Sequence, residues 1–123
     1  MDSRLRSLVP MAYVRNVGDS IAFYRKLGFE VLNTFVPDGR TDPTWAWLET
    51  GEARLMLALA SEPVIADQQA VLFYLYVDDV AAARSALEHA GVPVGPIEYP
   101  FYARRGEFRV RDPDRYVLMI THT

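Results

Sequence analysis

The side chains that could do chemistry in this chain favour binding over catalysis. The sequence contains no cysteine, which excludes thiolate nucleophiles, thiolate metal sites and disulfides. Its two histidines, His89 and His122, are far apart in the sequence, and we expect both to be surface residues. No serine lies in the glycine-rich elbow that activates a hydroxyl nucleophile. We therefore expect no catalytic residue.

An aromatic cluster is the clearest candidate for recognition. Trp45 and Trp47 alternate along one expected strand, and the loop 99–102 reads Tyr-Pro-Phe-Tyr. Exposed aromatic residues on loops often contact ligands, and each ring can stack on a flat or cationic group at roughly 0.5–2 kcal/mol. The tryptophans are equally typical of packing within a sheet or at a dimer interface, so both interpretations stay open. The carboxylates available to pair with a positive charge are Glu49, Glu98 and Glu107.

Composition limits the possible classes of protein. The 123 residues are 50% hydrophobic, enough for a packed core without crosslinks. The net charge is −3 and the charges are scattered, so we expect no nucleic-acid partner. The longest apolar runs, around 55–60 and 71–77, are far shorter than a membrane span, so we expect no membrane partner either. The absence of cysteine favours a reducing compartment, and we expect a cytoplasmic protein.

The chain repeats itself at an offset of 63 residues. Residues 14–17, followed by Gly28, match residues 77–80, followed at the same spacing by Gly91. Each copy is predicted to be a strand, a capped helix that ends at the glycine, and a further strand. The side chains expected to cap the two helices are Asp19 or Ser20 in the first copy and Asp78 or Asp79 in the second.

The rest of each copy is predicted to be β-strands separated by turns. Strands are expected at 30–36, 45–49 and 54–60 in the first half, and at 94–99, 107–111 and 116–121 in the second. This predicts an α+β fold of two tandem βαβββ modules that form a curved, cup-like mixed sheet with the helices outside. We expect one domain over residues 1–123, with module 1 at about 1–60, a linker at about 61–70 and module 2 at about 71–123.

Several segments carry a resemblance to a known family. Residues 20–31, Ser-Ile-Ala-Phe-Tyr-Arg-Lys-Leu-Gly-Phe-Glu-Val, resemble the first-helix signature of the vicinal oxygen chelate superfamily of glyoxalases, bleomycin-resistance proteins and extradiol dioxygenases. Residues 76–80 and 108–114 are similar to the matching segment of the second module and to the family's Asp-Pro-Asp-Gly hairpin. This chain has Arg115 where the family has the glycine. A positive φ there would cost roughly 1 kcal/mol.

The resemblance also indicates where a metal would be held. Metal-dependent members bind a divalent cation through His, Glu or Gln on four strands, two from each module. Aligning on the first-helix motif puts those positions at Val9, Met56, Leu72 and Met119, and the 63-residue offset relates them in pairs. None carries the oxygen or nitrogen donor that such a cation requires. We therefore expect no metal and no other cofactor.

If the former ligand positions face into a cup, strand alternation brings adaptable thioethers and tyrosine rings onto the same surface. A planar or heteroaromatic guest would suit that surface, although an apolar stripe of this kind also packs as a filled core. Together with the aromatic cluster, the residues expected to bind the ligand are Trp45, Trp47, Arg54, Met56, Tyr74, Tyr76, Phe101, Tyr102 and Met119.

The resemblance is greatest to metal-free bleomycin-resistance proteins. It implies a small-molecule-binding protein that sequesters an aromatic or heteroaromatic compound, such as a glycopeptide-type antibiotic, and that works as a homodimer. Two alternatives remain open from the sequence: a cofactor-independent lyase, isomerase or hydrolase on the same scaffold, and a non-catalytic interaction domain with a vestigial cleft.

Overall fold

The computed structural model describes residues 3–123, so Met1 and Asp2, which begin the expected first module, lie outside the described residues. The chain divides into two compact units, Met1–Val64 and Ile65–Thr123. Each unit contains one α-helix and one mixed β-sheet, which confirms the predicted α+β class. Within the described residues, no helix has the length and apolar character needed to cross a membrane.

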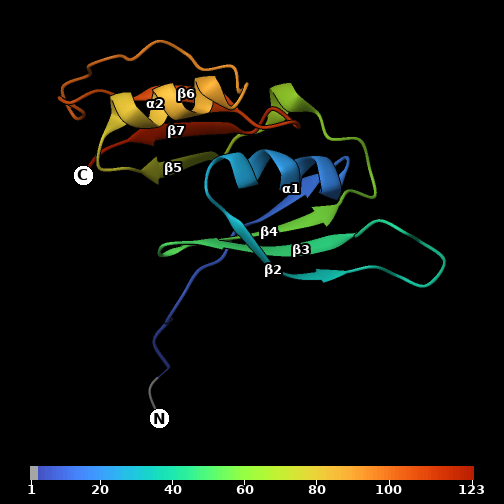
Figure 1. The fold of residues 1–123 in the computed structure, drawn as a ribbon. Helices are drawn as coiled ribbons and strands as arrows, with labels where there is room; N and C mark the ends of the chain where they lie inside the picture. Colours follow the sequence, from blue (N-terminus) through green and yellow to red (C-terminus); the bar gives the residue numbers. More distant parts are fainter. Residues whose placement is uncertain (1–2) are drawn as a thin grey trace. The chain divides into compact units, whose positions relative to one another are not determined.

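The first unit is a four-stranded sheet with one helix beside it (Figure 1). The strand order is β1-β4-β3-β2, with β1 parallel to β4 and the other neighbours antiparallel. The elements are β1 (Met11–Val14), α1 (Val17–Lys26), β2 (Glu30–Phe35), β3 (Trp45–Thr50) and β4 (Ala53–Leu59).

The core of the first unit lies between α1 and one face of its sheet. Alternate strand residues are fully buried, among them Leu48 on β3 and Leu57 on β4. The helix contributes Ile21 and Tyr24, which lie one turn apart on its buried side. The opposite face of the sheet therefore carries the other set of alternating side chains.

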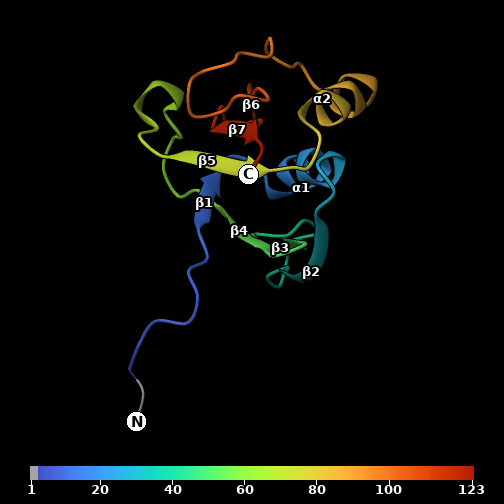
Figure 2. The same ribbon diagram turned by 90° about the vertical axis from the view of Figure 1, so that its left-hand side faces the viewer.

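The second unit repeats this arrangement with a three-stranded sheet in the order β5-β7-β6. Strands β5 and β7 are parallel, and β6 pairs antiparallel with β7. Figure 2 shows the long connection that leaves α2 and passes round to β6. The elements are a short 3₁₀ helix η1 (Ala66–Gln68), β5 (Leu72–Tyr76), α2 (Val80–His89), β6 (Phe108–Arg111) and β7 (Val117–Thr121).

The internal repeat of the sequence reappears in the strand register. Met11 pairs with Met56 in the first unit, and Tyr74 pairs with Met119 in the second. Tyr74 stands 63 positions after Met11, and Met119 stands 63 positions after Met56. Both helix-ending glycines adopt positive φ values, 98° at Gly28 and 82° at Gly91. The two units therefore share their helix ends and their central strand pairing.

The cap of the first helix differs from the prediction. Asn16, and neither Asp19 nor Ser20, is the N-cap: its Oδ1 accepts a hydrogen bond of 2.9 Å from the Asp19 amide. The Ser20 side chain is fully buried, so it belongs to the inner face of the helix. In the second helix Asp79 caps as expected, accepting from the Ala82 amide at 2.9 Å. The caps Asn16 and Asp79 again stand at matching positions of the repeat.

The strand expected at 94–99 does not form. Only an isolated bridge joins Glu98 to Glu107, and one further hydrogen bond of 3.0 Å runs from the Gly95 amide to the Arg109 carbonyl. Pro93 and Pro96 explain the difference, because proline has no amide hydrogen to donate to a strand ladder. This irregular segment leaves room beside β6.

Candidate ligand-binding site

The predicted site residues of the first unit share one face of its sheet. Trp47 pairs with Met56, and Trp45 pairs with Ala58, on strands β3 and β4. Their neighbours along the strands, such as Leu48, are buried in the core, so the tryptophans and Met56 occupy the face away from it. All three are only half-buried. The structure thus brings these residues together on an accessible surface.

Arg54 lies at the end of the same face and already has a partner. Its Nε is 2.5 Å from Oε1 of Glu49, which is its neighbour across the strand pair β3–β4. The pair neutralises both charges and keeps the arginine at the sheet edge. Glu49, one of the carboxylates expected to be available to a cationic ligand, is therefore engaged by Arg54.

In the second unit, Tyr74, Tyr76 and Met119 also share one sheet face. Tyr74 pairs with Met119, and Tyr76 pairs with Thr121, across the parallel strands β5 and β7. Tyr74 is 44% exposed and Tyr76 is 61% exposed, whereas Met119 is buried. The tyrosine rings therefore form an open aromatic surface beside the thioether of the central strand.

Phe101 and Tyr102 lie in the loop that precedes β6, where their rings meet edge to face with centroids 5.4 Å apart. Phe101 is almost fully exposed. The hydroxyl of Tyr102 donates a hydrogen bond of 2.9 Å to Oε1 of Glu107. This bond, together with the negative charge of Glu107 and a smaller contribution from Tyr74, raises the pKa of Tyr102 above its ordinary value.

The loop is anchored directly after Tyr102. The Arg105 amide donates to Nε2 of His122 at 2.9 Å, so this histidine, which we expected at the surface, lies in an exposed contact and has a hydrogen-bond partner there. Gly106 has a φ of 99°, and a Cβ there would lie 2.5 Å from Cγ2 of Ile97. Only glycine can occupy that position without a shift of its neighbours. The loop therefore holds Tyr102 over Glu107.

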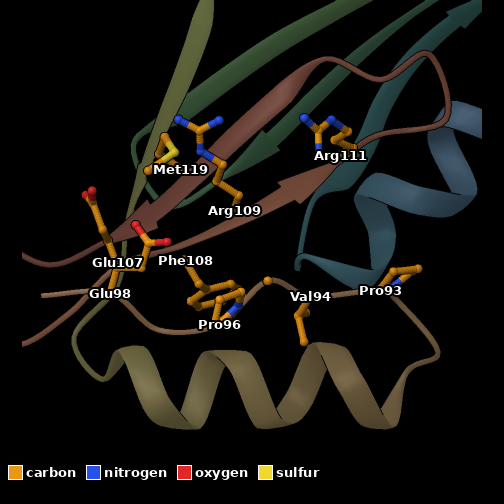
Figure 3. Close-up of a pocket in the computed structure, with 10 residues that line it drawn as sticks. Pro93, Val94, Pro96, Glu98, Glu107, Phe108, Arg109, Arg111 and Met119 are labelled. Atoms are coloured by element: carbon orange, nitrogen blue, oxygen red, sulfur yellow. The ribbon is translucent and has the colours of Figure 1, made fainter.

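A cavity of about 450 Å³ opens in the second unit, between β6 and the irregular segment that replaces the expected strand. Figure 3 shows its lining, with Glu98 and Glu107 at one end and Arg111 and Pro93 at the other. Of the nine predicted residues, Met119 is the one that lines it. The full lining comprises residues 93–96, Glu98, residues 107–109, Arg111 and Met119.

Glu107 is the most unusual residue of this cavity. Its side chain is only 4% exposed, and Oε1 accepts the bond from Tyr102. Among the described residues, its other carboxyl oxygen, Oε2, is buried without a hydrogen-bond partner. Buried polar atoms in proteins almost always have a partner, so a donor that reached this unpaired oxygen would be stabilising.

Sequence reasoning missed Arg109 and Arg111 and considered Glu107 only as one of several possible charge partners. The signal that could have identified them is the alternation Glu-Phe-Arg-Val-Arg over residues 107–111. In a strand this pattern puts three charged side chains on one face and two apolar side chains on the other. The structure shows that Phe108 and Val110 are buried in the core, as that pattern requires.

The positions at which metal-dependent relatives of the predicted family hold their cation do not suit one here. Met56, Leu72 and Met119 lie on strands β4, β5 and β7, and Val9 lies just before β1. Divalent catalytic metals need oxygen or nitrogen donors, which none of these four side chains supplies. Elsewhere in residues 3–123, no three His, Asp or Glu side chains converge in a geometry that could hold a metal ion.

Comparison with solved structures shows the same fold in proteins of low sequence identity. The bleomycin-binding protein of Streptomyces verticillus, solved with copper(II)-bleomycin, has a TM-score of 0.74 and 20% identity, and the match covers 99% of both chains. A bleomycin resistance determinant encoded on transposon Tn5 has a TM-score of 0.76 and 19% identity, over 97% of this chain and 98% of the other.

An enzyme shares the fold as well. Lactoylglutathione lyase from Agrobacterium tumefaciens has a TM-score of 0.70 and 20% identity, covering 98% of this chain and 96% of the lyase. The fold thus serves both an enzyme and proteins that bind an antibiotic. Comparison with curated protein sequences gave no match.

The sequence profile of one family covers nearly the whole chain. It matches residues 7–120, which include both units, the helix signature and the Asp-Pro-Asp hairpin on which the resemblance was based. The chain belongs to the glyoxalase, bleomycin resistance protein and dioxygenase superfamily.

Proposed function

We propose that this protein is a metal-free binding protein that sequesters an aromatic or heteroaromatic small molecule, as its bleomycin-binding structural neighbours bind an antibiotic. The observation that carries the proposal is the chemistry of four positions. Val9, Met56, Leu72 and Met119 replace the oxygen and nitrogen donors that metal-dependent members of the superfamily use. Without those donors, polarisation of a substrate oxygen by a cation has no support from this chain.

Accessible aromatic surfaces on both sheets support the binding of a small molecule. Trp45 and Trp47 in the first unit, and Tyr74 and Tyr76 in the second, present rings on the sheet faces opposite the cores. Such rings offer large contact areas at a low cost in side-chain entropy, and their polar edges orient a guest. We further propose that the protein works in the cytoplasm and that it forms a homodimer. A molar-mass measurement in solution tests the homodimer.

A thermal-shift and fluorescence screen of the purified protein tests the proposed function. The compounds are a bleomycin-type glycopeptide, heteroaromatic metabolites, and the divalent ions of nickel, zinc, manganese and iron. A ligand that binds only the folded state raises the melting temperature by mass action, and stacking on Trp45 or Trp47 changes the tryptophan fluorescence.

We expect at least one aromatic compound to give both signals, with the metal ions giving neither. Trp47→Ala should abolish or weaken the fluorescence response, because Trp47 lies beside Met56 at the centre of the sheet face. The control substitution is Ile65→Ala, because Ile65 is an exposed apolar residue outside the expected ligand-binding residues and its replacement leaves both tryptophans in place. Stabilisation by one divalent ion alone would contradict the metal-free assignment, and a screen without any response would contradict ligand binding.

A further inference from the structure

The cavity of the second unit has opposite charges at its two ends. Glu107, Arg109 and Arg111 follow one another at every second position, so they lie on one face of the strand. All three line the cavity, and the rise of a strand separates successive members of the series by about 6.8 Å. Figure 3 shows the two glutamates at one end of the lining and Arg111 at the other, with Arg109 between them.

Glu107 lacks a cationic partner in the described part of the chain. None of the described salt bridges involves it, and Tyr102 satisfies only one of its two oxygens. A buried carboxyl oxygen without a donor is unfavourable, whereas a protonated nitrogen placed there gains a charge-assisted hydrogen bond. The acidic end of the cavity therefore favours a ligand with a cationic N–H donor.

Arg109 offers the complementary group. Its side chain is exposed, and none of the described carboxylates forms a salt bridge with it. A guanidinium can bind a carboxylate through two parallel hydrogen bonds. Met119, which pairs with Arg109 across β6 and β7, contributes an apolar, adaptable surface beside the arginine.

We propose that this cavity binds a dipolar aromatic molecule whose protonated amine or amidine is held by Glu107 and whose acidic group is held by Arg109. The inference rests on the proposed small-molecule-binding function and names the chemical class of the ligand. Tyr102 is the positioning residue: by donating to Oε1 of Glu107 it fixes the carboxyl group at the acidic end of the cavity, where Oε2 is buried without a donor.

Calorimetric titration with three probes of nearly the same shape tests this assignment. They are 4-(aminomethyl)benzoate, which carries both charges, 4-methylbenzylamine, which carries only the positive charge, and 4-methylbenzoate, which carries only the negative charge. We expect the doubly charged probe to bind about 3-fold more tightly than 4-methylbenzylamine. It should bind at least about 10-fold more tightly than 4-methylbenzoate.

The variants separate the contributions of Glu107 and Arg109. Glu107→Gln keeps the shape but removes the charge, and should weaken the two amine-bearing probes about 10-fold with little effect on 4-methylbenzoate. Arg109→Gln should weaken the two carboxylate-bearing probes about 3-fold and leave 4-methylbenzylamine unchanged. The matched control is Glu88→Gln on α2, which removes an exposed carboxylate outside the cavity and should change no affinity.

Specific results would overturn the inference. One is equal affinity of wild-type protein and Glu107→Gln for 4-(aminomethyl)benzoate, and another is 4-methylbenzoate binding as tightly as the doubly charged probe. If none of the three probes binds while the heteroaromatic compounds of the general screen do, this inference fails and the proposed function stands. If nothing binds in either experiment, the proposed function fails as well. The exposed Arg109 variant keeps the test decisive should Glu107→Gln not fold.

Discussion

Tyr102 and Glu107 are joined by a hydrogen bond of 2.9 Å in which the tyrosine hydroxyl donates to a carboxyl oxygen that is otherwise buried. The bond and the negative charge both favour the protonated tyrosine, so the pKa of Tyr102 is raised above its ordinary value of about 10. Replacing Glu107 with glutamine removes the charge. We expect Glu107→Gln to lower the pKa of Tyr102 towards its ordinary value.

Ultraviolet titration of tyrosinate measures this pKa, with the contribution of Tyr102 obtained by subtracting the titration of Tyr102→Phe. The raised pKa also fixes the sign of the effect on stability. The Tyr102–Glu107 bond contributes fully below the pKa of an unfolded tyrosine, and its contribution is lost as the pH rises through the pKa in the folded protein. An unchanged Tyr102 titration in Glu107→Gln would show that the carboxylate does not control the hydroxyl.

The two helix caps predict a matched pair of stability effects. Asn16→Ala and Asp79→Ala should each lower the free energy of unfolding by about 1 kcal/mol, because each removes the acceptor of one amide at the first helical turn. Asp19→Ala should cost less, about 0.3–0.5 kcal/mol, since its side chain contributes only its charge near the helix start. Denaturant unfolding of the three variants measures the difference. A larger loss for Asp19→Ala than for Asn16→Ala would contradict the cap assignment.

Ser20 offers a second check on the same helix. Its hydroxyl is buried without a hydrogen-bond partner among the described residues, so Ser20→Ala removes an unsatisfied polar atom. We expect the free energy of unfolding to stay unchanged or to rise by up to about 1 kcal/mol. Thermal unfolding with Ser85→Ala as the control separates this effect from general helix propensity, because Ser85 is exposed on α2.

The sequence was sufficient to predict the two repeated units because their signals are local. Gly28 and Gly91 each end a helix through a positive φ, and hydrophobic alternation identifies strands such as β3 and β4. The N-cap of α1 was assigned wrongly because several polar residues near the start of the helix could each act as the cap. Asn16 caps the helix because its backbone is extended there, which leaves Ser20 inside the helix.

The cavity could not be predicted, because it depends on a strand that fails to form. The alternating pattern at 94–99 favours a strand, but Pro93 and Pro96 remove amide donors, and the segment pairs with the chain around β6 only through Gly95 and Glu98. The burial of Glu107 is likewise a tertiary property, since it depends on the loop that holds Tyr102 above it. Charged residues are assumed to be solvated when only the sequence is read.

The Asp-Pro-Asp hairpin depends on one buried carboxylate. Oδ1 of Asp112 accepts hydrogen bonds of 2.9 Å from the amides of both Asp114 and Tyr116. Asp112→Ala leaves these donors without that acceptor and should lower the free energy of unfolding by about 2–4 kcal/mol. Asp112→Asn keeps an oxygen acceptor and should cost about half as much. Denaturant unfolding compares the two variants, and equal losses would show that the acceptor geometry is not what stabilises the turn.

The same hairpin contains a strained residue whose replacement should stabilise the protein. Arg115 has a φ of 68°, the only positive φ of a non-glycine among the described residues, and stands where the resemblance to the family predicts glycine. A left-handed conformation costs an L-residue about 1–2 kcal/mol, and the extra entropy of an unfolded glycine offsets part of that cost. We therefore expect Arg115→Gly to raise the free energy of unfolding by about 0.5–1 kcal/mol.

Arg104→Gly is the control for this last prediction, because Arg104 is also an exposed loop arginine but has no positive φ. There the glycine adds unfolded-state entropy without relieving strain, so we expect a loss of about 0.5–1 kcal/mol. Thermal and denaturant unfolding of the two variants should thus shift in opposite directions. If both arginine-to-glycine changes destabilise the protein equally, the positive φ at Arg115 carries no strain, and the hairpin has accommodated arginine by changing its turn.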